Sequence, residues 1–423
     1  MINRQTLLEV LLENRNEVMR YEVIRRNISL DGFERQVLVG VRRAGKSYLL
    51  FGHIQKLVEN GIPLEQIVYI NFEDERLANL QLEDLNTILE IQASINHSRP
   101  ILFLDEIQNI EGWEKFARRL ADQKYSVYIT GSNAKMLSQD VATTLGGRFL
   151  TTEVFPFSFE EFLQINGKDI RNQLLLATTN NRADFMRLYE EYFQFGGFPE
   201  CATLPSKRDY LMSLYQKIFL GDIAARNRIE NLFALKTLIR KIAESVNQPL
   251  SFTRATNIVA STGTKIGKNT VINYIEYAKE ACLLFSINNI ADNLTERVSN
   301  PKYYFIDNGI ISLLALDIRT SLLENMIALS LIRKYGSKES IYYYSNGVEV
   351  DFYIPETETA IQVSYTVKNR TETYDREIKA LHKISERLAV KRKLIITFDE
   401  GNNALISESG IEIIPAWKFI ANL

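Results

Sequence analysis

Residues 40–47 read GVRRAGKS, in which two glycines precede a lysine and a serine at a spacing that suits polyphosphate binding. The glycines let the backbone bend so that successive N–H groups face an anion, and a helix beginning near Lys46 adds the positive end of its dipole. Lys46 can reach the β- and γ-phosphates of a nucleotide, and the Ser47 hydroxyl suits Mg²⁺. The alternative is a plain glycine turn, which the apolar run before residue 40 and the helical pattern after it disfavour. The predicted nucleotide-binding residues are Gly40, Val41, Arg42, Arg43, Ala44, Gly45, Lys46, Ser47 and Tyr48.

Two carboxylates, Asp105 and Glu106, directly follow the apolar run at 101–104. Acidic groups in such a place are costly to bury unless they are used. We predict that Asp105 holds Mg²⁺, directly or through water. Glu106 then polarises the water that attacks the γ-phosphate, and is catalytic together with Lys46. The alternative is a pair of strand-end carboxylates that face solvent.

Two further positions are candidates for catalysis. Asn133, or Ser132 beside it, follows the apolar run at 125–130 and is expected to contact the γ-phosphate and the attacking water. The alternative is a Gly-Ser-Asn turn that caps the next helix. Arg148 is placed to stabilise transition-state charge on the nucleotide of a neighbouring subunit, which would require a homo-oligomer. It could equally pair inside its own domain.

These side chains need a scaffold, and the first third of the chain predicts one. Short apolar runs at 36–39, 67–72, 101–104, 125–130 and 152–155 are typical of strands that are buried on both faces. Helical patterns separate them, so we expect a five-stranded, mostly parallel sheet with helices on both sides. Active groups in such a sheet lie at the carboxyl ends of the strands, which is where the candidates fall.

Composition restricts the remaining classes. A chain of 423 residues favours two to four domains, and its 46% hydrophobic and 24% charged residues are typical of soluble globular protein. The net charge of −2 excludes a globally basic nucleic-acid surface. Cys201 and Cys282 fit neither a metal nor a disulfide pattern. Without an apolar run of about 18 residues or a signal-peptide pattern, we expect a cytoplasmic protein that does not contact the membrane.

The middle of the chain changes character twice. Residues 156–245 have helical periodicity and are expected to form a lid or connector beside the nucleotide. From residue 246, a helix, a glycine-containing turn, a second helix and two strands follow one another as in a winged helix-turn-helix. Such a module binds DNA through the start of its second helix, or serves as a spacer or protein contact. The exposed polar residues expected there are Lys265, Lys268, Asn269 and Asn273.

The last hundred residues show the order of a restriction-endonuclease-like domain. Glu324 lies on a predicted helix, and Asp351 lies in a predicted hairpin that turns at Asn346 and Gly347. Active members of this class hold Mg²⁺ with a second carboxylate, followed two residues later by a lysine. Here Gln362 and Ser364 occupy those two positions.

An amide is a poor Mg²⁺ ligand, and a serine cannot supply the positive charge of the lysine. Lys368 or Lys379 would have to take its place, and nothing in the sequence requires this. We therefore predict a degenerate nuclease-like site, at Glu324, Asp351, Gln362 and Ser364, without cleavage activity.

The motifs resemble a known family. GVRRAGKS, ILFLDE, YITGSN, LGGRF and the run at 155–162 look like the prokaryotic AAA_14-type P-loop ATPases. FGGFPE at 195–200, the GDI stretch through Arg226, and YFIDNG at 304–309 resemble the DUF4143-type domain that usually follows. The resemblance covers nearly the whole chain and implies a P-loop fold with an extra catalytic glutamate, and the use of ATP.

The sequence therefore predicts an α/β protein with four parts: a P-loop ATPase core with a parallel sheet (1–155), a helical lid (156–245), a winged helix-turn-helix (246–310) and a restriction-endonuclease-like α/β domain (311–423). The expected function is Mg²⁺-dependent ATP hydrolysis that drives conformational change in the C-terminal modules on DNA. Two alternatives are a nucleotide-dependent switch or scaffold for another protein without DNA binding, and an ATP-regulated nuclease.

Overall fold

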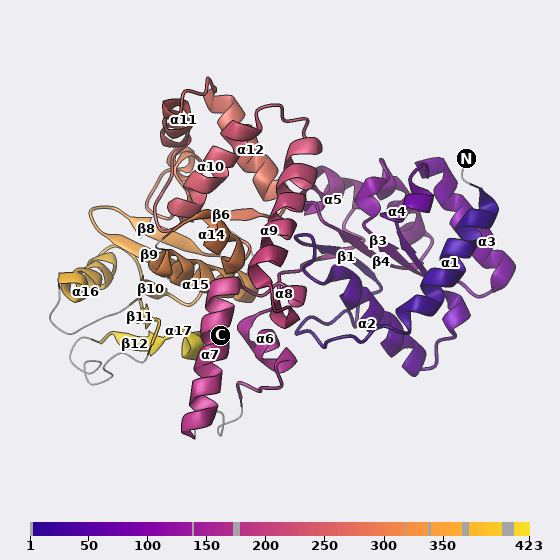
Figure 1. Ribbon diagram of the computed structural model, residues 1–423, viewed down its shortest axis with the longest axis horizontal. Coiled ribbons are helices and arrows are strands. Elements are labelled where there is room, and N and C mark those ends of the chain that lie inside the picture. Colours follow the sequence, from indigo (N-terminus) through magenta and orange to yellow (C-terminus); the bar gives the residue numbers. More distant parts are fainter. Residues whose placement is uncertain are drawn as a thin grey trace. The chain divides into compact units, whose positions relative to one another are not determined.

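The computed structural model describes residues 3–137, 139–171, 178–316, 318–336, 340–365, 372–399 and 410–423. The chain divides into two compact units between Phe155 and Pro156, here called the N-terminal and C-terminal units. Figure 1 shows the helices and strands of each. Within the described ranges, no helix has the length and apolar character needed to cross a membrane.

The N-terminal unit is built on a parallel sheet of five strands in the order β2-β3-β4-β1-β5. All four strand pairs are parallel, so the predicted α/β core is confirmed. The last strand begins at Leu150, two residues before the predicted run. The strands are β1 (Arg35–Val39), β2 (Ile67–Asn71), β3 (Ile101–Asp105), β4 (Ser126–Gly131) and β5 (Leu150–Glu153).

The register brings the carboxyl ends of β1, β3 and β4 level with one another. Val39 of β1 lies opposite Gly131 of β4, and Leu104 of β3 lies opposite Ile129 of β4. The three strands therefore end at nearly the same level, with β4 in the middle. Polar residues that follow these three strands must therefore share one edge of the sheet.

Amphipathic helices cover this sheet. In the helix after β3, Trp113, Phe116, Ala117, Leu120 and Ala121 are buried at the i, i+3, i+4, i+7 and i+8 spacing of a single helical face. That face packs on β4. The helices of the unit are α1 (Arg4–Val18), α2 (Lys46–Glu59), α3 (Leu85–Ile95), α4 (Trp113–Asp122) and α5 (Gln139–Leu145), with short 3₁₀ turns at Leu64–Gln66, Glu75–Leu77, Leu82–Asp84, Ile107–Asn109 and Ala134–Leu137.

The C-terminal unit begins with helices. These are α6 (Phe159–Ile165), α7 (Thr179–Phe195), α8 (Pro199–Thr203), α9 (Lys207–Lys217), α10 (Leu232–Glu244), α11 (Phe252–Ser261) and α12 (Lys268–Glu280). A π-helix, η7 (Ile218–Ala225), continues α9. The helices α10, α11 and α12 pack in succession and stand together in Figure 1. The helices α11 and α12 follow residue 246, where two helices separated by a glycine-containing turn were expected.

A mixed sheet of seven strands completes this unit, in the order β12-β11-β10-β9-β8-β6-β7. The two strands expected to form a wing, β6 and β7, pair antiparallel, and β6 also pairs with β8. The expected boundary at residue 310 therefore runs through one continuous sheet, and the separate winged-helix and nuclease-like domains remain predictions. The strands are β6 (Leu284–Asn289), β7 (Lys302–Phe305), β8 (Tyr342–Ser345), β9 (Glu349–Ile354), β10 (Thr359–Ser364), β11 (Arg392–Thr397) and β12 (Glu412–Pro415).

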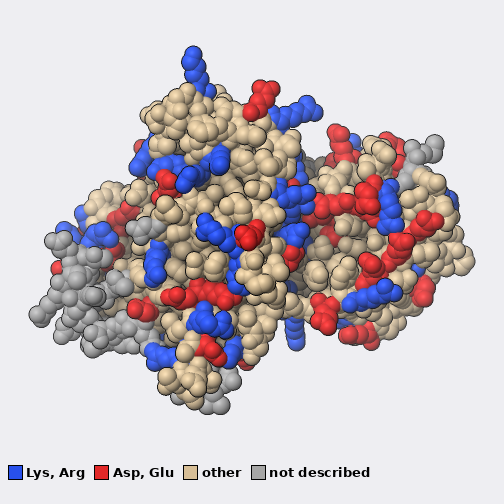
Figure 2. All heavy atoms as spheres, viewed as in Figure 1, with Lys and Arg blue, Asp and Glu red and all other residues tan. Residues whose placement is uncertain are grey.

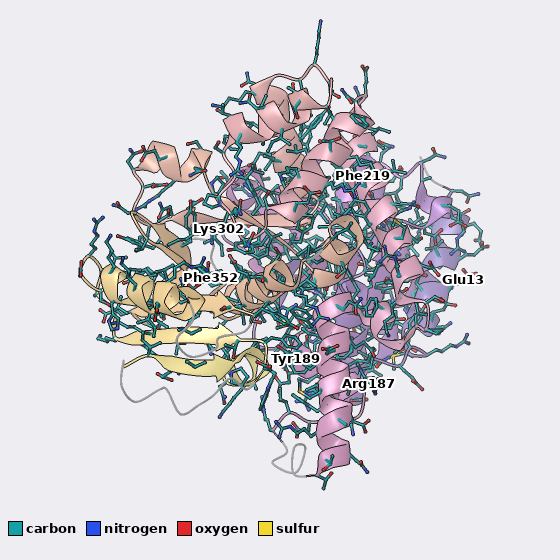
Figure 3. All side chains as sticks on the ribbon, turned by 60° about the vertical axis from the view of Figure 1, so that its left-hand side comes forward. Glu13, Arg187, Tyr189, Phe219, Lys302 and Phe352 are labelled. Atoms are coloured by element: carbon teal, nitrogen blue, oxygen red, sulfur yellow. The ribbon has the colours of Figure 1, made fainter. Side chains whose placement is uncertain are left out.

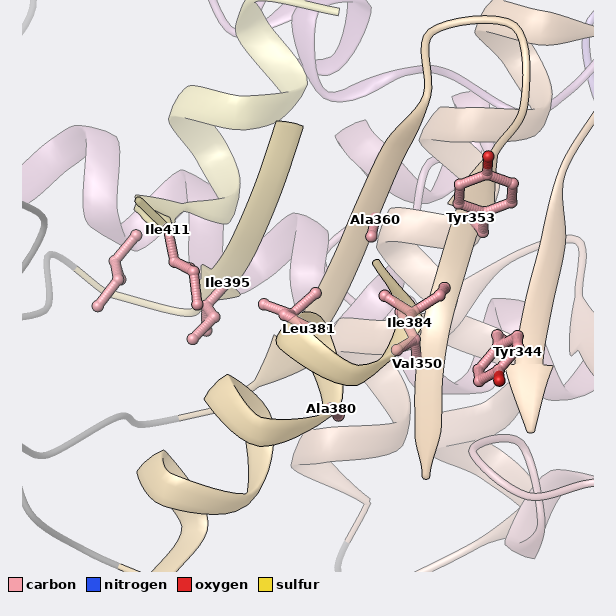
Figure 4. Close-up of a cluster of buried hydrophobic side chains, with 10 residues drawn as sticks. Tyr344, Val350, Tyr353, Ala360, Ala380, Leu381, Ile384, Ile395 and Ile411 are labelled. Atoms are coloured by element: carbon pink, nitrogen blue, oxygen red, sulfur yellow. The ribbon is translucent and has the colours of Figure 1, made fainter. Parts of the chain in front are cut away.

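Helix α16 covers β9 and β10 through a buried apolar cluster that includes Ala360, Leu381, Ile384 and Ile395 (Figure 4). Leu388, which lies beyond the end of this helix, packs on the same cluster. The remaining helices are α13 (Leu294–Ser299), α14 (Asn308–Leu314), α15 (Arg319–Tyr335), α16 (Glu372–Ile384) and α17 (Ala416–Ala421).

Two motifs that are far apart in the sequence meet in the core of the C-terminal unit. The carboxylate of Asp307 accepts the backbone N–H of Gly197 at 2.7 Å and that of Gly309 at 2.8 Å. Gly196 has φ +74° and ψ −162°, a conformation that is essentially restricted to glycine. A Cβ on Gly196 would lie 1.7 Å from an Asp307 oxygen. The FGGFP and IDNG motifs thus form one packed junction between α7 and α14.

We expect Gly196→Ala to destabilise the C-terminal unit strongly, since it adds a clash to backbone strain. Gly263→Ala is the matched control, because Gly263 has φ +84° and a Cβ added there would meet nothing within 4 Å, so only the strain of roughly 1–2 kcal/mol applies. Denaturant unfolding of both variants measures the difference. Equal losses would show that the junction relaxes around the methyl group.

The junction should also respond to pH. Burial raises the pKa of Asp307 from 3.8 to about 7. The two backbone N–H groups and the charge of Arg333 lower this pKa, but by less than burial raises it. The folded state therefore binds a proton that the unfolded state releases, and the contribution of Asp307 to stability falls as the pH rises from about 4 to 7. In Asp307→Asn, an amide NH₂ would face a backbone N–H, at a cost of about 1–3 kcal/mol.

The amide does not titrate, so the loss of stability in Asp307→Asn should be largest near pH 5 and smaller near pH 8. Thermal unfolding of the wild type and the variant at both values tests this. A loss that grows with pH would contradict the raised pKa.

Candidate active site

The glycine-rich segment forms a loop between β1 and α2. Gly45 has φ +94° and precedes the first residue of α2, so the N-terminus of that helix faces the inside of the loop. Gly40 passes so close to β5 that a Cβ would lie 2.0 Å from the carbonyl oxygen of Val154. A larger residue at position 40 would push the loop off the sheet.

Arg26, which sequence reasoning missed, braces this loop. Its guanidinium donates one hydrogen bond of 2.9 Å to the carbonyl of Ala44 and another of 2.9 Å to the carbonyl of Phe155. No local pattern marks Arg26, because its partners follow 18 and 129 residues later in the sequence.

Lys46 points into the loop and is buried. Its ammonium donates to the carbonyls of Gly40 at 3.0 Å and Val41 at 3.1 Å. It also lies 3.3 Å from Oε1 of Glu106. The structure thus brings together the predicted cation and the predicted catalytic carboxylate, from the ends of β1 and β3.

Asp105 is completely buried at the end of β3. Its carboxylate accepts hydrogen bonds from the hydroxyls of Tyr69 at 2.7 Å, Thr130 and Ser47. Burial, and then the negative charge of Glu106, raise the pKa of Asp105. The three hydroxyl donors lower this pKa but do not outweigh the other two effects. The predicted metal ligands Ser47 and Asp105 are therefore adjacent, and their hydroxyl and carboxylate oxygens are the kind of donors that Mg²⁺ prefers.

Glu106 adopts a left-handed backbone with φ +54°, which is strained for a residue that is not glycine. Its N–H donates to the Thr130 hydroxyl at 2.9 Å. Its Oε2 accepts the Gln108 amide at 2.6 Å and the Ser132 N–H at 3.1 Å. Burial alone would raise the pKa of Glu106, but Lys46 and then Gln108 outweigh it, so the pKa lies below its ordinary value. A deprotonated, oriented carboxylate suits a general base.

Gln108 is a second residue that sequence reasoning missed. Its amide also lies 3.4 Å from the Ser132 hydroxyl, so it links the ends of β3 and β4. Asn133 is buried beside them, and its Oδ1 accepts the N–H of Lys135 at 2.9 Å, which is the geometry of the capping alternative. A contact between Asn133 and the γ-phosphate stays a prediction.

Arg148 pairs inside the N-terminal unit. Its guanidinium binds the carboxylate of Asp122 and donates to the carbonyl of Gly146 at 3.2 Å. The side chain is one-third exposed. A role at the nucleotide of a neighbouring subunit would require Arg148 to leave Asp122, and that role stays a prediction.

A cavity of about 680 Å³ lies between α2 and the segment at 23–31. Tyr48 lines it and is half exposed. His53 also lines it, and its buried Nε2 has no hydrogen-bond partner. Tyr48, the first residue of α2 that lines the cavity, directly follows Ser47 of the phosphate loop in the sequence.

In the C-terminal unit, the predicted site residues Glu324 and Asp351 both contact the same side chain. That side chain belongs to Lys302, which the sequence did not single out. Lys302 of β7 is completely buried, and its ammonium lies 3.2 Å from Glu324, 3.2 Å from Asp351 and 2.8 Å from Glu349. Figure 3 shows Lys302 among the strands of this unit, near Phe352 of β9. Burial would lower the pKa of Lys302, but the three carboxylates raise it above its ordinary value.

Gln362 and Ser364 lie on β10, where the order of the motif places them. The Gln362 amide oxygen accepts the N–H of Asp351 at 2.8 Å. Its NH₂ group donates to the carbonyl of Glu349 at 3.0 Å and to the carboxylate of Glu377. Lys379 is exposed on α16, and Lys368 lies outside the described residues.

Comparisons with known proteins support the family resemblance. A family profile described as "AAA domain" matches residues 33–163. Two profiles described as domains of unknown function, DUF8612 and DUF4143, match residues 186–321 and 319–419. Among solved structures, the Walker-type ATPase PABY2304 of Pyrococcus abyssi aligns over 75% of this chain and 96% of its own, at 14% identity and a TM-score of 0.44.

The sequence relatives cover more of the chain. An uncharacterized protein of Haemophilus influenzae is 29% identical over 80% of this chain and 84% of its own length. An uncharacterized protein of Methanocaldococcus jannaschii is 35% identical over 99% of this chain and 96% of its own length. With both profiles in the expected order, the chain belongs to the prokaryotic family in which an AAA_14-type AAA domain precedes a DUF4143 domain.

Proposed function

We propose that this protein hydrolyses ATP in the presence of Mg²⁺ and uses the reaction to change the conformation of its C-terminal unit on DNA. The observation that carries the proposal is the distance of 3.3 Å between the ammonium of Lys46 and the carboxylate of Glu106 at the carboxyl edge of the parallel sheet. It joins a phosphate-binding cation to a general base in one buried site.

The residues divide the work between binding and proton transfer. Phosphate oxygens compete with the carbonyls of Gly40 and Val41 for Lys46, because a charged acceptor binds an ammonium more strongly than a neutral one. When Lys46 turns to the phosphates, Oε1 of Glu106 is released. Gln108 and the Ser132 N–H continue to hold Oε2, so the freed oxygen is positioned to accept a proton from the attacking water.

Ser47 and Asp105 would hold Mg²⁺, which when bound neutralises negative charge on the phosphates. The base of the nucleotide has room in the cavity between α2 and the segment at 23–31, which is lined by the half-exposed ring of Tyr48 and by His53. Both features lie on α2, directly after the phosphate loop, so one element would position both ends of the nucleotide.

DNA association is supported by the start of α12. Lys265, Lys268, Asn269 and Asn273 are all exposed. Within the described part of the chain, none of these side chains has a hydrogen bond or an ion pair, so all four are free to meet an external partner. Figure 2 shows basic side chains projecting from the part of the C-terminal unit that carries α11 and α12. Exposed cations at a helix N-terminus suit phosphate contacts along a groove.

We expect Lys46→Ala to abolish ATP hydrolysis and weaken ATP binding, because the phosphates lose their fixed cation. Glu106→Gln should bind ATP like the wild type but turn over about 10²–10⁴-fold more slowly, since only proton transfer is lost. Phosphate release and nucleotide affinity measure the two effects. Glu111→Gln, an exposed glutamate nearby, is the control and should keep wild-type turnover. Normal hydrolysis in Lys46→Ala would refute the site.

We expect the double variant Lys265→Ala, Lys268→Ala to bind duplex DNA more weakly, with a salt dependence shallower by about two phosphate contacts. The double variant Arg208→Ala, Lys217→Ala removes the same charge from exposed positions on α9 and is the control. Anisotropy titrations at several salt concentrations give both slopes. Identical slopes would exclude the surface at the start of α12, and no DNA binding by the wild type would favour the protein switch.

A further inference from the structure

In the C-terminal unit, Glu324, Asp351, Gln362 and Ser364 follow one another in the order of a nuclease site that holds a divalent metal ion. The space between the two carboxylates decides whether such an ion fits. Mg²⁺ requires about six oxygen ligands at 2.0–2.1 Å. The space between Glu324 and Asp351 already contains the ammonium of Lys302, at 3.2 Å from each carboxylate and 2.8 Å from Glu349. These are hydrogen-bond distances from a nitrogen donor, and the three carboxylates all meet that one nitrogen.

Burial of the side chain and contacts of its ammonium group both hold Lys302 in this position. Its side chain is completely buried, and its ammonium lies 5.5 Å from the ring centre of Tyr343. It extends from β7, while its partners come from α15 and β9, so the ammonium joins three elements of the unit. No water has access to Lys302, so it is badly placed to act on an attacking water itself.

Glu324 and Asp351 each have a further hydrogen-bond partner besides Lys302. Tyr304 donates its hydroxyl to the same Glu324 oxygen that meets Lys302, at 2.8 Å. The second oxygen of Asp351 accepts the N–H of Val363 at 2.9 Å. Among the described residues, no group of three or more His, Cys, Asp or Glu side chains is arranged to hold a metal ion.

The residue at position 362 fits the same interpretation. Its amide nitrogen donates to Glu377 and its amide oxygen accepts from the backbone of Asp351. A glutamate there would turn a carboxylate toward Glu377, which is already paired with Arg376, and add a further negative charge beside Asp351. The amide thus limits the negative charge that Lys302 and Arg376 must balance.

We propose that the Lys302 ammonium permanently takes the place of the divalent cation in this nuclease-like cluster, so that the wild-type C-terminal unit binds no metal there. Lys302 joins β7 to β9 and α15 in the role that a structural ion would have. Removing the ammonium while keeping the carboxylates should open a divalent-cation site.

The test measures Mn²⁺ binding to the full-length, nucleotide-free chain by electron paramagnetic resonance, together with the effect of Mn²⁺ on Tm. The phosphate loop is unchanged in every variant, so its contribution is common to all. Lys302→Ala should bind one more Mn²⁺ per chain than the wild type, and Mn²⁺ should raise its Tm. Adding Asp351→Asn to this variant should remove both effects. Lys302→Met, which removes the charge but fills the space, should gain no ion.

Two results of the Mn²⁺ measurements would overturn the proposal. One is a folded Lys302→Ala variant that gains no Mn²⁺. The other is a wild-type Mn²⁺ site that is lost in Asp351→Asn, which would show that the ion and the lysine coexist. The second comparison does not involve a Lys302 variant, so it decides the question even if Lys302→Ala fails to fold. DNA cleavage by the wild type that disappears with Asp351→Asn would also refute the proposal.

Discussion

In the parallel sheet, β4 lies between β1 and β3, and the candidate active site depends on this order. The loop after β1 supplies Lys46, the end of β3 supplies Asp105 and Glu106, and β4 supplies Thr130 between them. Its hydroxyl binds the Asp105 carboxylate and accepts the Glu106 N–H, so one threonine fixes both acids. A direct pairing of β1 with β3 would leave no place for this residue.

The two units contain buried lysines with opposite properties. Lys46 rests on neutral carbonyls and one carboxylate at the mouth of a loop, an arrangement that an incoming anion can outcompete. Lys302 rests on three carboxylates inside a sheet, where no anion can reach it. The two lysines therefore differ in the number and charge of their partners, and this difference underlies the different roles proposed for them.

The local sequence was sufficient to predict a group of residues where its chemistry requires particular residue types at short spacing. The phosphate loop and the two acids after β3 could be predicted because an ordinary turn does not require glycines followed by a lysine and a serine, and an ordinary strand end does not require two adjacent acids. Lys302 and Arg26 could not, because their partners are supplied by tertiary structure. Lys302 meets Asp351 from 49 positions away, and it reads as an ordinary strand residue until the sheet is assembled.

The same limit explains the extent of the second sheet. The strands β6 and β7 follow the second helix as expected, but their membership of a seven-stranded sheet depends on the pairing of Asn288 with Tyr342. Strand periodicity carries no information about a partner more than 50 residues away.

Arg26 gives the phosphate loop a mechanical connection to the end of the N-terminal unit. One rigid, planar guanidinium holds the carbonyl of Ala44 in the loop and the carbonyl of Phe155, the last residue before the chain passes into the C-terminal unit. A displacement of the loop must either break one of these hydrogen bonds or pull on the other. Arg26 therefore couples the position of the phosphate loop to that of the residue at which the chain leaves the N-terminal unit.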